Sequence, residues 1–417
     1  MKATRRQFLV SSTAAGMLGR LPSSLPRPSA TRDYRPTVTP DGATLPFRIV
    51  DGVKVLHLVP GPVTHAFAPG LEAECWGYNG RVHGPTIEIV EGDRVRIYVT
   101  NRLAAPTTVH WHGVAVPNGM DGVGGLSQRA IEPGETFKYE FTPPRAGTFM
   151  YHSHHDEMTQ MAMGMMGMLV VHPREQAGPP VDRDFVYLLS EWKITPGTRR
   201  PDPNEMVDFN VLTLNARIFP GTQPLVVRKG ERVRIRIGNL SAMDHHPIHL
   251  HGHRFTVTET DGGAVPESAR WPETTVVVPV GSVRVIEFVA DNPGDWALHC
   301  HMTHHVMTQM GHGIPNLLGV DPGEFDERLA RSLPAFDAPA GEIAGHGGGD
   351  SAIPRNSLPM MGGAGPHGYI TMGGMFTLLK VRESLPPEPG GGWYADPPGT
   401  RADAATPDEL ARDGIGP

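Results

Sequence analysis

Cysteine is scarce in this chain, which contains only Cys75 and Cys300 among its 417 residues. Two cysteines can form one disulfide at most, so a disulfide scaffold is excluded. A chain of this length can form two or three domains with full hydrophobic cores.

The chain also lacks an excess of basic charge. It carries 37 Lys and Arg against 44 Asp and Glu, a formal net charge of -7, so nothing indicates nucleic acid as a partner. Glycine and proline are abundant instead, with 50 and 42 residues. This composition favours turn-rich β structure over helix bundles.

A long apolar run is missing as well. The mildly apolar run near the N-terminus extends only to about Leu18 and is too short to span a membrane. It follows Arg5 and Arg6, and a twin-arginine pair before such a run resembles a Tat export signal. We therefore expect residues 1–45 to be a Tat-type signal and a disordered leader rich in Pro, Ser and Thr. The protein is then periplasmic or secreted, and the alternative is a simple basic tail.

Two stretches of the chain repeat one pattern. Residues 85–101 and 224–239 each read as a strand, a turn at Gly92 or Gly230, and an alternating strand that ends in Asn. Each stretch is followed by a His-x-His pair, another strand pair and a second His-x-His pair. Short strands, regular turns and non-local pairing indicate Greek-key sandwiches or barrels.

The repeat predicts two β domains at 46–173 and 183–330, joined by the linker 174–182. The Gly/Pro/Met-rich residues 331–417 are expected to be a loosely held tail. Within this tail, residues 376–381 have the pattern of one last strand that docks on a domain.

Metal-binding residue types gather around Cys300, which stands between His299 and His301 and is followed by His305 and Met310. Copper selects Cys, His and Met, and a His₂Cys set with a weak axial Met is the blue-copper arrangement. On a strand, the two flanking imidazoles point to the face opposite the thiol. One short segment could therefore reach two metal sites. For an isolated thiol, the alternative is a buried structural cysteine.

Four His-x-His pairs stand at matching places of the repeat, and residues spaced by two lie on one face of a strand. The pairs are His110 and His112, His152 and His154, His249 and His251, and His299 and His301. His246 supplies the second imidazole that a site at Cys300 needs. Ten histidines, one cysteine and one methionine thus make twelve candidate ligands.

In chain order these motifs read HWHG, HSH, HPIHLHGH and HCHxxxHxxxxM. They resemble the four copper motifs of the multicopper oxidases, a laccase-like cupredoxin family, and the resemblance covers residues 75–310. It implies an all-β chain of two cupredoxin-like Greek-key β-barrel or sandwich domains. It also implies four coppers per functional unit: one of type 1, one of type 2 and two of type 3.

The resemblance assigns each ligand to a copper. The type 1 ligands are His246, Cys300, His305 and Met310; the type 2 ligands are His110 and His249; one type 3 set is His112, His152 and His301, and the other is His154, His251 and His299. Both halves of the chain contribute to the three-copper cluster, so the cluster is expected between two domains.

The first domain departs from the second at the type 1 positions. Ser153 stands where the second domain has Cys300, and Thr107 stands where it has His246. A hydroxyl cannot replace the thiolate, so the first domain is expected to hold no type 1 copper. Asp121 is a turn aspartate on local grounds, whereas its family position resembles that of the catalytic carboxylate that orients the type 2 water and handles protons. Both interpretations stay open.

The resemblance implies an oxidase that takes single electrons from a phenolic compound or a metal ion and uses four of them to reduce O₂ to water. Electrons are expected to arrive at an exposed edge of His305 or His246. They then pass along Cys300, the catalytic thiolate, to the histidines beside it.

Two other functions stay open. The methionine-rich run 158–168 suggests a copper-binding or copper-tolerance protein with little turnover, although such a run also fills cores. A copper nitrite reductase also has two cupredoxin domains, but it needs a type 1 site where this chain has Ser153.

Resemblance to two-domain members of the family implies a homotrimer, in which six domains form a ring. Each three-copper cluster would lie between the first domain of one subunit and the second domain of the next. The expected partners are the small-molecule or metal-ion reductant and O₂, with neither nucleic acid nor a membrane span.

Overall fold

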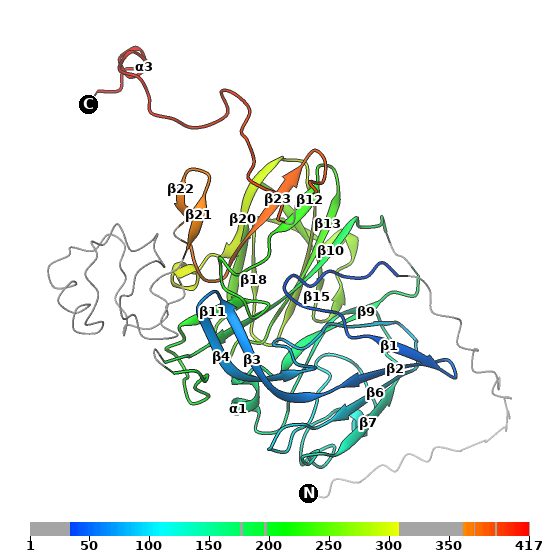
Figure 1. Ribbon diagram of the computed structural model, residues 1–417. Helices are drawn as coiled ribbons and strands as arrows, with labels where there is room; N and C mark the ends of the chain where they lie inside the picture. The colour runs from blue at the N-terminus through cyan, green and yellow to red at the C-terminus, as the bar shows by residue number, and fades with distance from the viewer. Residues whose placement is uncertain are drawn as a thin grey trace, which may run out of the picture.

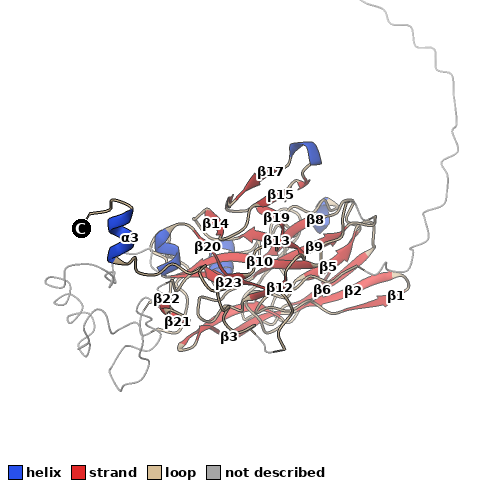
Figure 2. Cartoon of the chain, turned by 90° about the horizontal axis from the view of Figure 1, so that it is seen from above, coloured by secondary structure: helices blue, strands red, loops and turns tan. Residues whose placement is uncertain are grey.

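The structure, a computed structural model, describes residues 34–175, 178–195, 198–307, 362–370, 372–387 and 390–416. The expected export signal and the candidate ligand Met310 lie outside these ranges. The described chain is nearly all β, as predicted, and its strands form two domains (Figures 1 and 2).

The first domain contains two sheets that enclose one core. One sheet is built from β1 (Phe47–Val50), β2 (Val53–Leu58), β6 (Val95–Thr100) and β7 (Thr136–Phe141), and the other from β5 (Ile87–Val90), β9 (Met166–His172) and β8 (Gly147–His152). Along β6, Val95, Ile97 and Val99 are fully buried and alternate with half-buried polar residues, the pattern of a strand with one face in the core.

Three smaller elements complete the first domain. They are the hairpin of β3 (Pro60–Ala68) and β4 (Leu71–Tyr78), the 3-10 turn η1 (Asn118–Met120) and the short helix α1 (Glu157–Ala162). The hairpin packs on the second domain, where Phe67 and Cys75 share a cluster with Trp192 and Ile194. Cys75 is buried there as a structural thiol and forms no disulfide.

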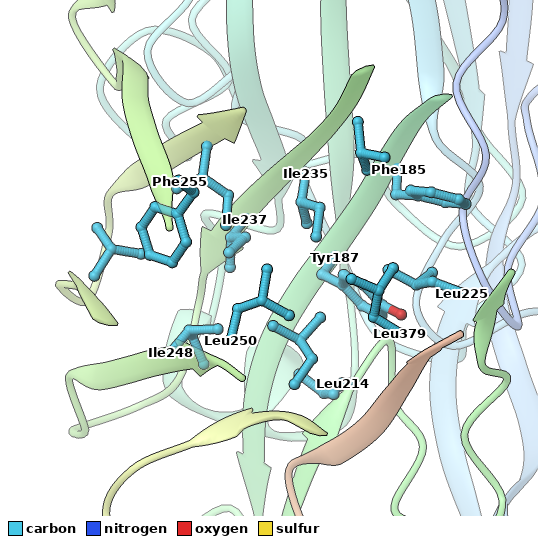
Figure 3. Packing of buried hydrophobic residues seen from close by; sticks show 14 of the residues in the cluster. Phe185, Tyr187, Leu214, Leu225, Ile235, Ile237, Ile248, Leu250, Phe255 and Leu379 are labelled. Carbon is cyan, nitrogen blue, oxygen red and sulfur yellow. The ribbon is translucent and has the colours of Figure 1, made fainter. Parts of the chain in front are cut away.

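The second domain repeats this arrangement with sheets that contain more strands. The first sheet runs β11 (Val211–Leu214), β10 (Arg183–Trp192), β13 (Arg232–Asn239), β19 (Val283–Val289), β15 (Phe255–Thr260) and β16 (Gly263–Ala264), with β17 (Trp271–Glu273) also on β15; the second runs β12 (Leu225–Arg228), β23 (Phe376–Arg382), β20 (Gly294–Cys300), β14 (His246–Leu250) and β18 (Thr275–Val278). Figure 3 shows Tyr187 and Ile237 of one sheet meeting Leu250 and Leu379 of the other in the interior.

The remaining elements lie outside these sheets. They are η2 (Glu267–Ala269), η3 (Thr303–Met307), the hairpin of β21 (Gly363–Gly365) and β22 (Gly368–Ile370), and the helix α3 (Pro407–Arg412) near the C-terminus. Among the described residues, no helix is long and apolar enough to cross a membrane.

The strand β23 is the last strand of the second repeat. It pairs antiparallel with β20 and parallel with β12, as β9 pairs with β8 and β5 in the first domain. Figure 1 shows β23, in orange, between these two strands. The strand pattern seen at 376–381 is therefore part of the second domain. This corrects the expected boundary at 330, because the domain continues to Arg382 after the intervening residues.

The end of the expected leader is also packed. The backbone N–H of Thr37 donates to Glu88, Val38 pairs with Phe185 of the second domain, and Leu45 is buried. Residues 34–45 thus belong to the folded part of the chain, which corrects the expected disorder up to residue 45. The Pro and Thr residues there form bridges to both domains, and the sequence pattern does not reveal such contacts.

Methionine and arginine side chains join the two domains. Met150 and Met168 of the first domain pack against Val186 and Leu188 of the second. Beside them, the buried guanidinium of Arg236 donates to both oxygens of Asp184 and to the hydroxyl of Thr148 across the interface. Because this buried charge is fully paired, it ties the domains together at a defined position.

Candidate metal centre

Three side chains that lie far apart in the sequence converge at one end of the second domain. They are His246 at the start of β14, Cys300 at the end of β20 and His305 in η3. The Cys300 Sγ lies 3.7 Å from His246 Nδ1 and 3.4 Å from His305 Nδ1, and the two nitrogens are 3.0 Å apart. A His₂Cys set with all three donor atoms this close matches the residues that would hold a blue copper.

Burial keeps these three groups in their neutral forms. It lowers the pKa of His246 to about 3 and that of His305 to about 4, and raises the pKa of the Cys300 thiol to about 12. Neutral imidazoles keep a lone pair free for a metal. The thiol ionises only with a cation beside it, so metal binding should release a proton. This donor set fits copper.

The orientation of His246 is set by a residue that sequence reasoning did not single out. The hydroxyl of Ser241 lies 2.7 Å from His246 Nε2, and both residues are buried. When Nε2 carries the proton and donates it to Ser241, the Nδ1 lone pair faces Cys300. Fixing the tautomer from the far side of the ring is the common role of a group behind a metal ligand.

Two carboxylates stand behind the loop before His246. Glu191 Oε1 accepts the backbone N–H groups of Met243 and Asp244, and Asp244 Oδ2 lies 3.8 Å from His305 Nε2. Burial, together with the neighbouring Asp244, raises the pKa of Glu191 well above its ordinary value, which favours the protonated carboxyl.

The first four His-x-His imidazoles meet in the first domain. The rings of His110 and His112 lie 5.8 Å apart, and those of His110 and His152 lie 5.4 Å apart, while His154 is 5.5 Å from His110. Ligand atoms of His110, His112 and His152 all lie within 4.8 Å of one another. These residues are brought together by an isolated bridge between His110 and His152.

The other four meet in the second domain. His249 lies 4.6 Å from His251, 5.7 Å from His299 and 5.4 Å from His301, measured between ring centroids. The register of β14 against β20 places His249 opposite His299, which explains why two separate motifs form one set. The structure therefore brings together each group of four that the repeat predicts.

Backbone carbonyls orient several of these rings. The Nδ1 of His110 bonds to the Asp121 carbonyl at 2.7 Å and that of His249 to the Thr274 carbonyl at 2.7 Å. His152 Nδ1 bonds to the Ser153 carbonyl at 2.8 Å in the same way. A ring whose Nδ1–H donates to a carbonyl presents its Nε2 lone pair to a metal.

Asp121 lies directly beside the expected type 2 ligand. Its carboxylate Oδ1 is 3.4 Å from His110 Nδ1, the same nitrogen that its own carbonyl contacts, and the side chain is one-third exposed. It follows the turn η1, so the local interpretation as a turn aspartate also describes it. A second carboxylate, Glu157, stands 3.8 Å from His152 and 3.6 Å from His154 and was not anticipated.

The Cys300 residue links the two kinds of site. Its thiol faces His246 and His305, while its carbonyl accepts a 2.8 Å hydrogen bond from His299 Nδ1 on the opposite face of the strand. The alternation along β20 that the sequence predicts is thus observed. A covalent path and a hydrogen-bonded path both connect the thiol to the His299 ring.

In the first domain, three hydrogen-bonded side chains occupy the place that corresponds to the His₂Cys set of the second domain. Thr107 and Ser153 lie 3.4 Å apart, and both hydroxyls bond to Gln160 Oε1, at 2.7 and 2.6 Å. Gln160 is buried and its amide nitrogen donates to the Pro106 carbonyl. In this amide plug, two hydroxyls and an amide oxygen stand in place of the thiolate and the two imidazoles of the second domain, and this set does not fit a type 1 copper.

The methionine run proves to be mainly core. Met163, Met165, Met166 and Met168 are each at most 3% exposed, whereas Met158 on α1 is 62% exposed. Core packing therefore describes most of the run. Its copper-handling interpretation stays a hypothesis, and it concerns the exposed Met158 and the half-buried Met161.

Both type 1 histidines are buried within the protein, with 0% of His246 and of His305 exposed. The expected exposed imidazole edge is therefore not found. The neighbouring Met302 is 37% exposed and His304 is exposed as well, so η3 presents other side chains to the solvent.

Among the described residues, each observed ring contact between these eight imidazoles joins two members of the same domain. His112, at the margin of its set, bonds through Nε2 to the Gly281 carbonyl of the second domain at 2.9 Å. Each set alone offers only half of the ligands that a three-copper cluster needs.

Comparisons with known proteins agree with this geometry. A family model described as multicopper oxidase matches residues 61–176, and a second with the same description matches residues 193–316. Together the two matches cover more than half of the chain, and each match lies in one of the two domains. The chain belongs to the multicopper oxidase family.

The curated relatives include copper resistance protein A of Escherichia coli, which is 30% identical over 46% of this chain and 40% of its own. Multicopper oxidase MmcO of Mycobacterium tuberculosis is 32% identical, over 60% of this chain and 51% of its own. Laccase-1 of Cryptococcus neoformans is 30% identical, over 62% and 46%. The chain spans about a third to a half of the length of the curated relatives it matches.

Solved structures match over a larger share. The blue copper oxidase from Nitrosomonas europaea has a TM-score of 0.58 and 27% identity, covering 78% of this chain and 85% of that one. The multicopper oxidase mgLAC has a TM-score of 0.57 and 29% identity over the same shares. Both are similar to this chain in its two-domain arrangement of β sheets.

Proposed function

We propose that this protein is a multicopper oxidase that couples the one-electron oxidation of a phenolic compound or a metal ion to the four-electron reduction of O₂ to water. The observation that carries the proposal is the position of Cys300. Its thiol belongs to a His₂Cys set, and its backbone joins that set to two histidines of a second set. A copper-storage protein does not need this connection.

Copper supplies the redox chemistry when it is bound, by accepting electrons singly at one site and passing them to O₂ at another. The protein positions the donors and excludes water from them. His246, Cys300 and His305 form the buried set that receives electrons, and their three side chains are 0% exposed. The Cys300–His299 hydrogen bond shortens the path between the two sets.

The eight remaining histidines would hold the other three coppers. Asp121 stands at His110 and is available to hold or move a proton during O₂ reduction, while Glu157 stands at His152 and His154. Reduction of O₂ to water consumes four protons as well as four electrons, so carboxylates beside these imidazoles have a chemical purpose.

A copper-tolerance function remains the second candidate, because two relatives are named copper resistance protein A and Met158 is exposed. Oxygen uptake by copper-loaded protein separates the two. If the protein is an oxidase, adding a phenol or adding Cu(I) should cause O₂ consumption. The donor that gives the faster O₂ consumption identifies the substrate class. Copper binding without O₂ consumption would favour the second candidate. A nitrite reductase is disfavoured by the amide plug at Gln160, although one relative, from Kuenenia stuttgartiensis, is named probable nitrite reductase-hydroxylamine oxidoreductase fusion protein.

We further propose a homotrimer, with each three-copper cluster formed between the first domain of one subunit and the second domain of the next. Its support is that each set holds four imidazoles, and that no ring contact joins the two sets in the part of the chain that the structure describes. Head-to-tail contacts of this kind close into a ring when the rotation permits. Copper shared across subunits should then stabilise the assembly.

The trimer can be tested by mixing two inactive variants, His110→Ala/His112→Ala and His299→Ala/His301→Ala, under conditions that allow subunits to exchange. Shared clusters predict partial recovery of O₂ uptake, because some interfaces unite two intact sets. Each variant alone, treated in the same way, is the control. A copper-loaded, active monomer in light scattering would contradict the proposal.

Export is proposed from the twin arginines alone. Changing Arg5 and Arg6 to lysine should retain the protein in the cytoplasm of a Tat-competent host. Unchanged export of this variant would show that these residues are not a Tat signal.

A further inference from the structure

The axial ligand of the type 1 site has a second candidate source in the structure. The motif spacing assigns Met310, but the strand that completes the site, β23, begins only at Phe376. In the first domain, β9 starts at Met166, shortly after Ser153. The second domain therefore carries a long insertion between its cysteine and its last strand. Two methionines, Met372 and Met375, stand directly before that strand.

The registers of the two domains match residue for residue. His152 lies opposite Met166 as His299 lies opposite Phe376, and Gly147 lies opposite Val171 as Gly294 lies opposite Val381. Met375 is therefore the counterpart of Met165. Their backbone bonds agree: Ser153 donates to the Met165 carbonyl at 3.2 Å and Cys300 to the Met375 carbonyl at 3.0 Å.

The same correspondence identifies the counterpart of His305. The Met165 N–H donates to the carbonyl of Gln160 at 3.0 Å, and the Met375 N–H donates to the carbonyl of His305 at 3.0 Å. Gln160 is the residue whose amide oxygen accepts hydrogen bonds from the hydroxyls of Thr107 and Ser153 in the first domain. The repeat therefore relates Thr107, Ser153 and Gln160 of the first domain to His246, Cys300 and His305 of the second. The last strand of each domain occupies the same position beside these residues.

The residue Met375 thus bridges two ligand residues. Its N–H bonds to His305 and its carbonyl to Cys300, while the backbone N–H groups of Gly373 and Gly374 both donate to the Val306 carbonyl. Met375 is 0% exposed and belongs to the same buried cluster as Cys300. In an antiparallel pair, opposite residues share a face, so its thioether lies on the thiol face of the sheet.

We propose that the segment Met372–Met375, and not Met310, supplies the weak axial thioether of the type 1 site. The segment is bonded to both ligand residues, and Met372 and Met375 carry its two thioethers. This inference rests on the proposed blue-copper function. It makes the segment directly before β23 part of the metal centre.

The test compares Met372→Leu/Met375→Leu with Met310→Leu in the copper-loaded full-length protein. The readout is the type 1 reduction potential, followed through the copper-thiolate absorption band. Loss of the axial thioether raises the potential. The double variant should therefore show a clear upward shift, while Met310→Leu keeps the wild-type value. The two single variants then assign the ligand within the segment.

Several controls keep the outcomes distinct. Met168→Leu, a buried methionine in the first domain, should leave the potential unchanged and measures the effect of a core Met→Leu change. Replacing the identified methionine by glutamine should lower the potential, since an amide oxygen is a stronger axial donor. A wild-type protein without the thiolate band would refute the proposed function itself. A wild-type potential in the double variant, or a larger shift in Met310→Leu, would overturn the axial assignment.

Discussion

Replacement of Ser241 by alanine should weaken copper binding at the type 1 site without unfolding the domain. The Ser241 hydroxyl is the only hydrogen-bond partner of His246 Nε2 found among the described residues, at 2.7 Å. Copper needs the tautomer with the proton on Nε2, because Nδ1 faces Cys300. Without Ser241, the free protein can adopt the other tautomer or rotate the ring, whereas the copper-bound protein cannot.

The size of the effect follows from burial. Ser241 is 2% exposed and His246 is 0% exposed, so the bound form would keep an unpaired buried N–H. Leaving such a donor unsatisfied costs about 1–3 kcal/mol, which corresponds to roughly 5-fold to 150-fold in an equilibrium constant. Loss of a group behind a metal ligand typically weakens affinity by about 10–100-fold. The two estimates agree.

The assay is a competition titration with a copper chelator, followed through the thiolate absorption band. Ser241→Ala should lose the band at about 10–100-fold lower chelator concentration than the wild type. Ser241→Thr keeps the hydroxyl and should stay close to the wild type. An unchanged affinity in Ser241→Ala would refute the argument that this hydrogen bond selects the tautomer.

Three other predictions concern single residues. Cys300→Ser should abolish the intense thiolate absorption while the type 2 electron-spin signal remains, and a retained band would exclude Cys300 as the ligand. Asp121→Asn should slow O₂ reduction with four coppers still bound and leave reduction of the type 1 site by the donor unaffected, whereas normal turnover would leave Asp121 a turn residue. Burial lowers the pKa of His83 from 6.5 to about 3, so the unfolded chain takes up a proton that the folded chain refuses. The free energy of unfolding should therefore fall as the pH is lowered below about 6.5, and His83→Gln should show a shallower slope in urea titrations at several pH values; an equal slope would contradict this assignment.

Residue identity and spacing predict which side chains the fold brings close together, whereas the copper that each of them binds stays a prediction. The interval of two between His110 and His112 fixes their common face, and the position of Cys300 between two histidines fixes the opposite one. These relations depend only on neighbouring residues of one strand, so the folded structure retains them. The repeat also predicts two domains, because each half needs the same strands to enclose a core, but it does not fix where the second domain ends.

Long-range contacts could not be read in this way. Ser241 and Gln160 are ordinary polar residues whose roles depend on strand pairing, and their neighbours in sequence carry no metal-ligand pattern. The last strand, β23, is separated from Cys300 by 75 residues, 301–375. A spacing rule therefore selected Met310, the nearer methionine, and only the register of β20 against β23 brings Met375 to the site. Burial of His246 and His305 likewise depends on what packs over them.

The ratio of donor oxidised to O₂ consumed tests the account most directly. With fully copper-loaded protein and a one-electron phenolic donor, four donor molecules should be oxidised for each O₂, with no hydrogen peroxide released. This ratio requires that electrons collected at Cys300 reach a complete three-copper cluster. A ratio of two with peroxide as product, or no O₂ consumption at all, would contradict the proposed oxidase.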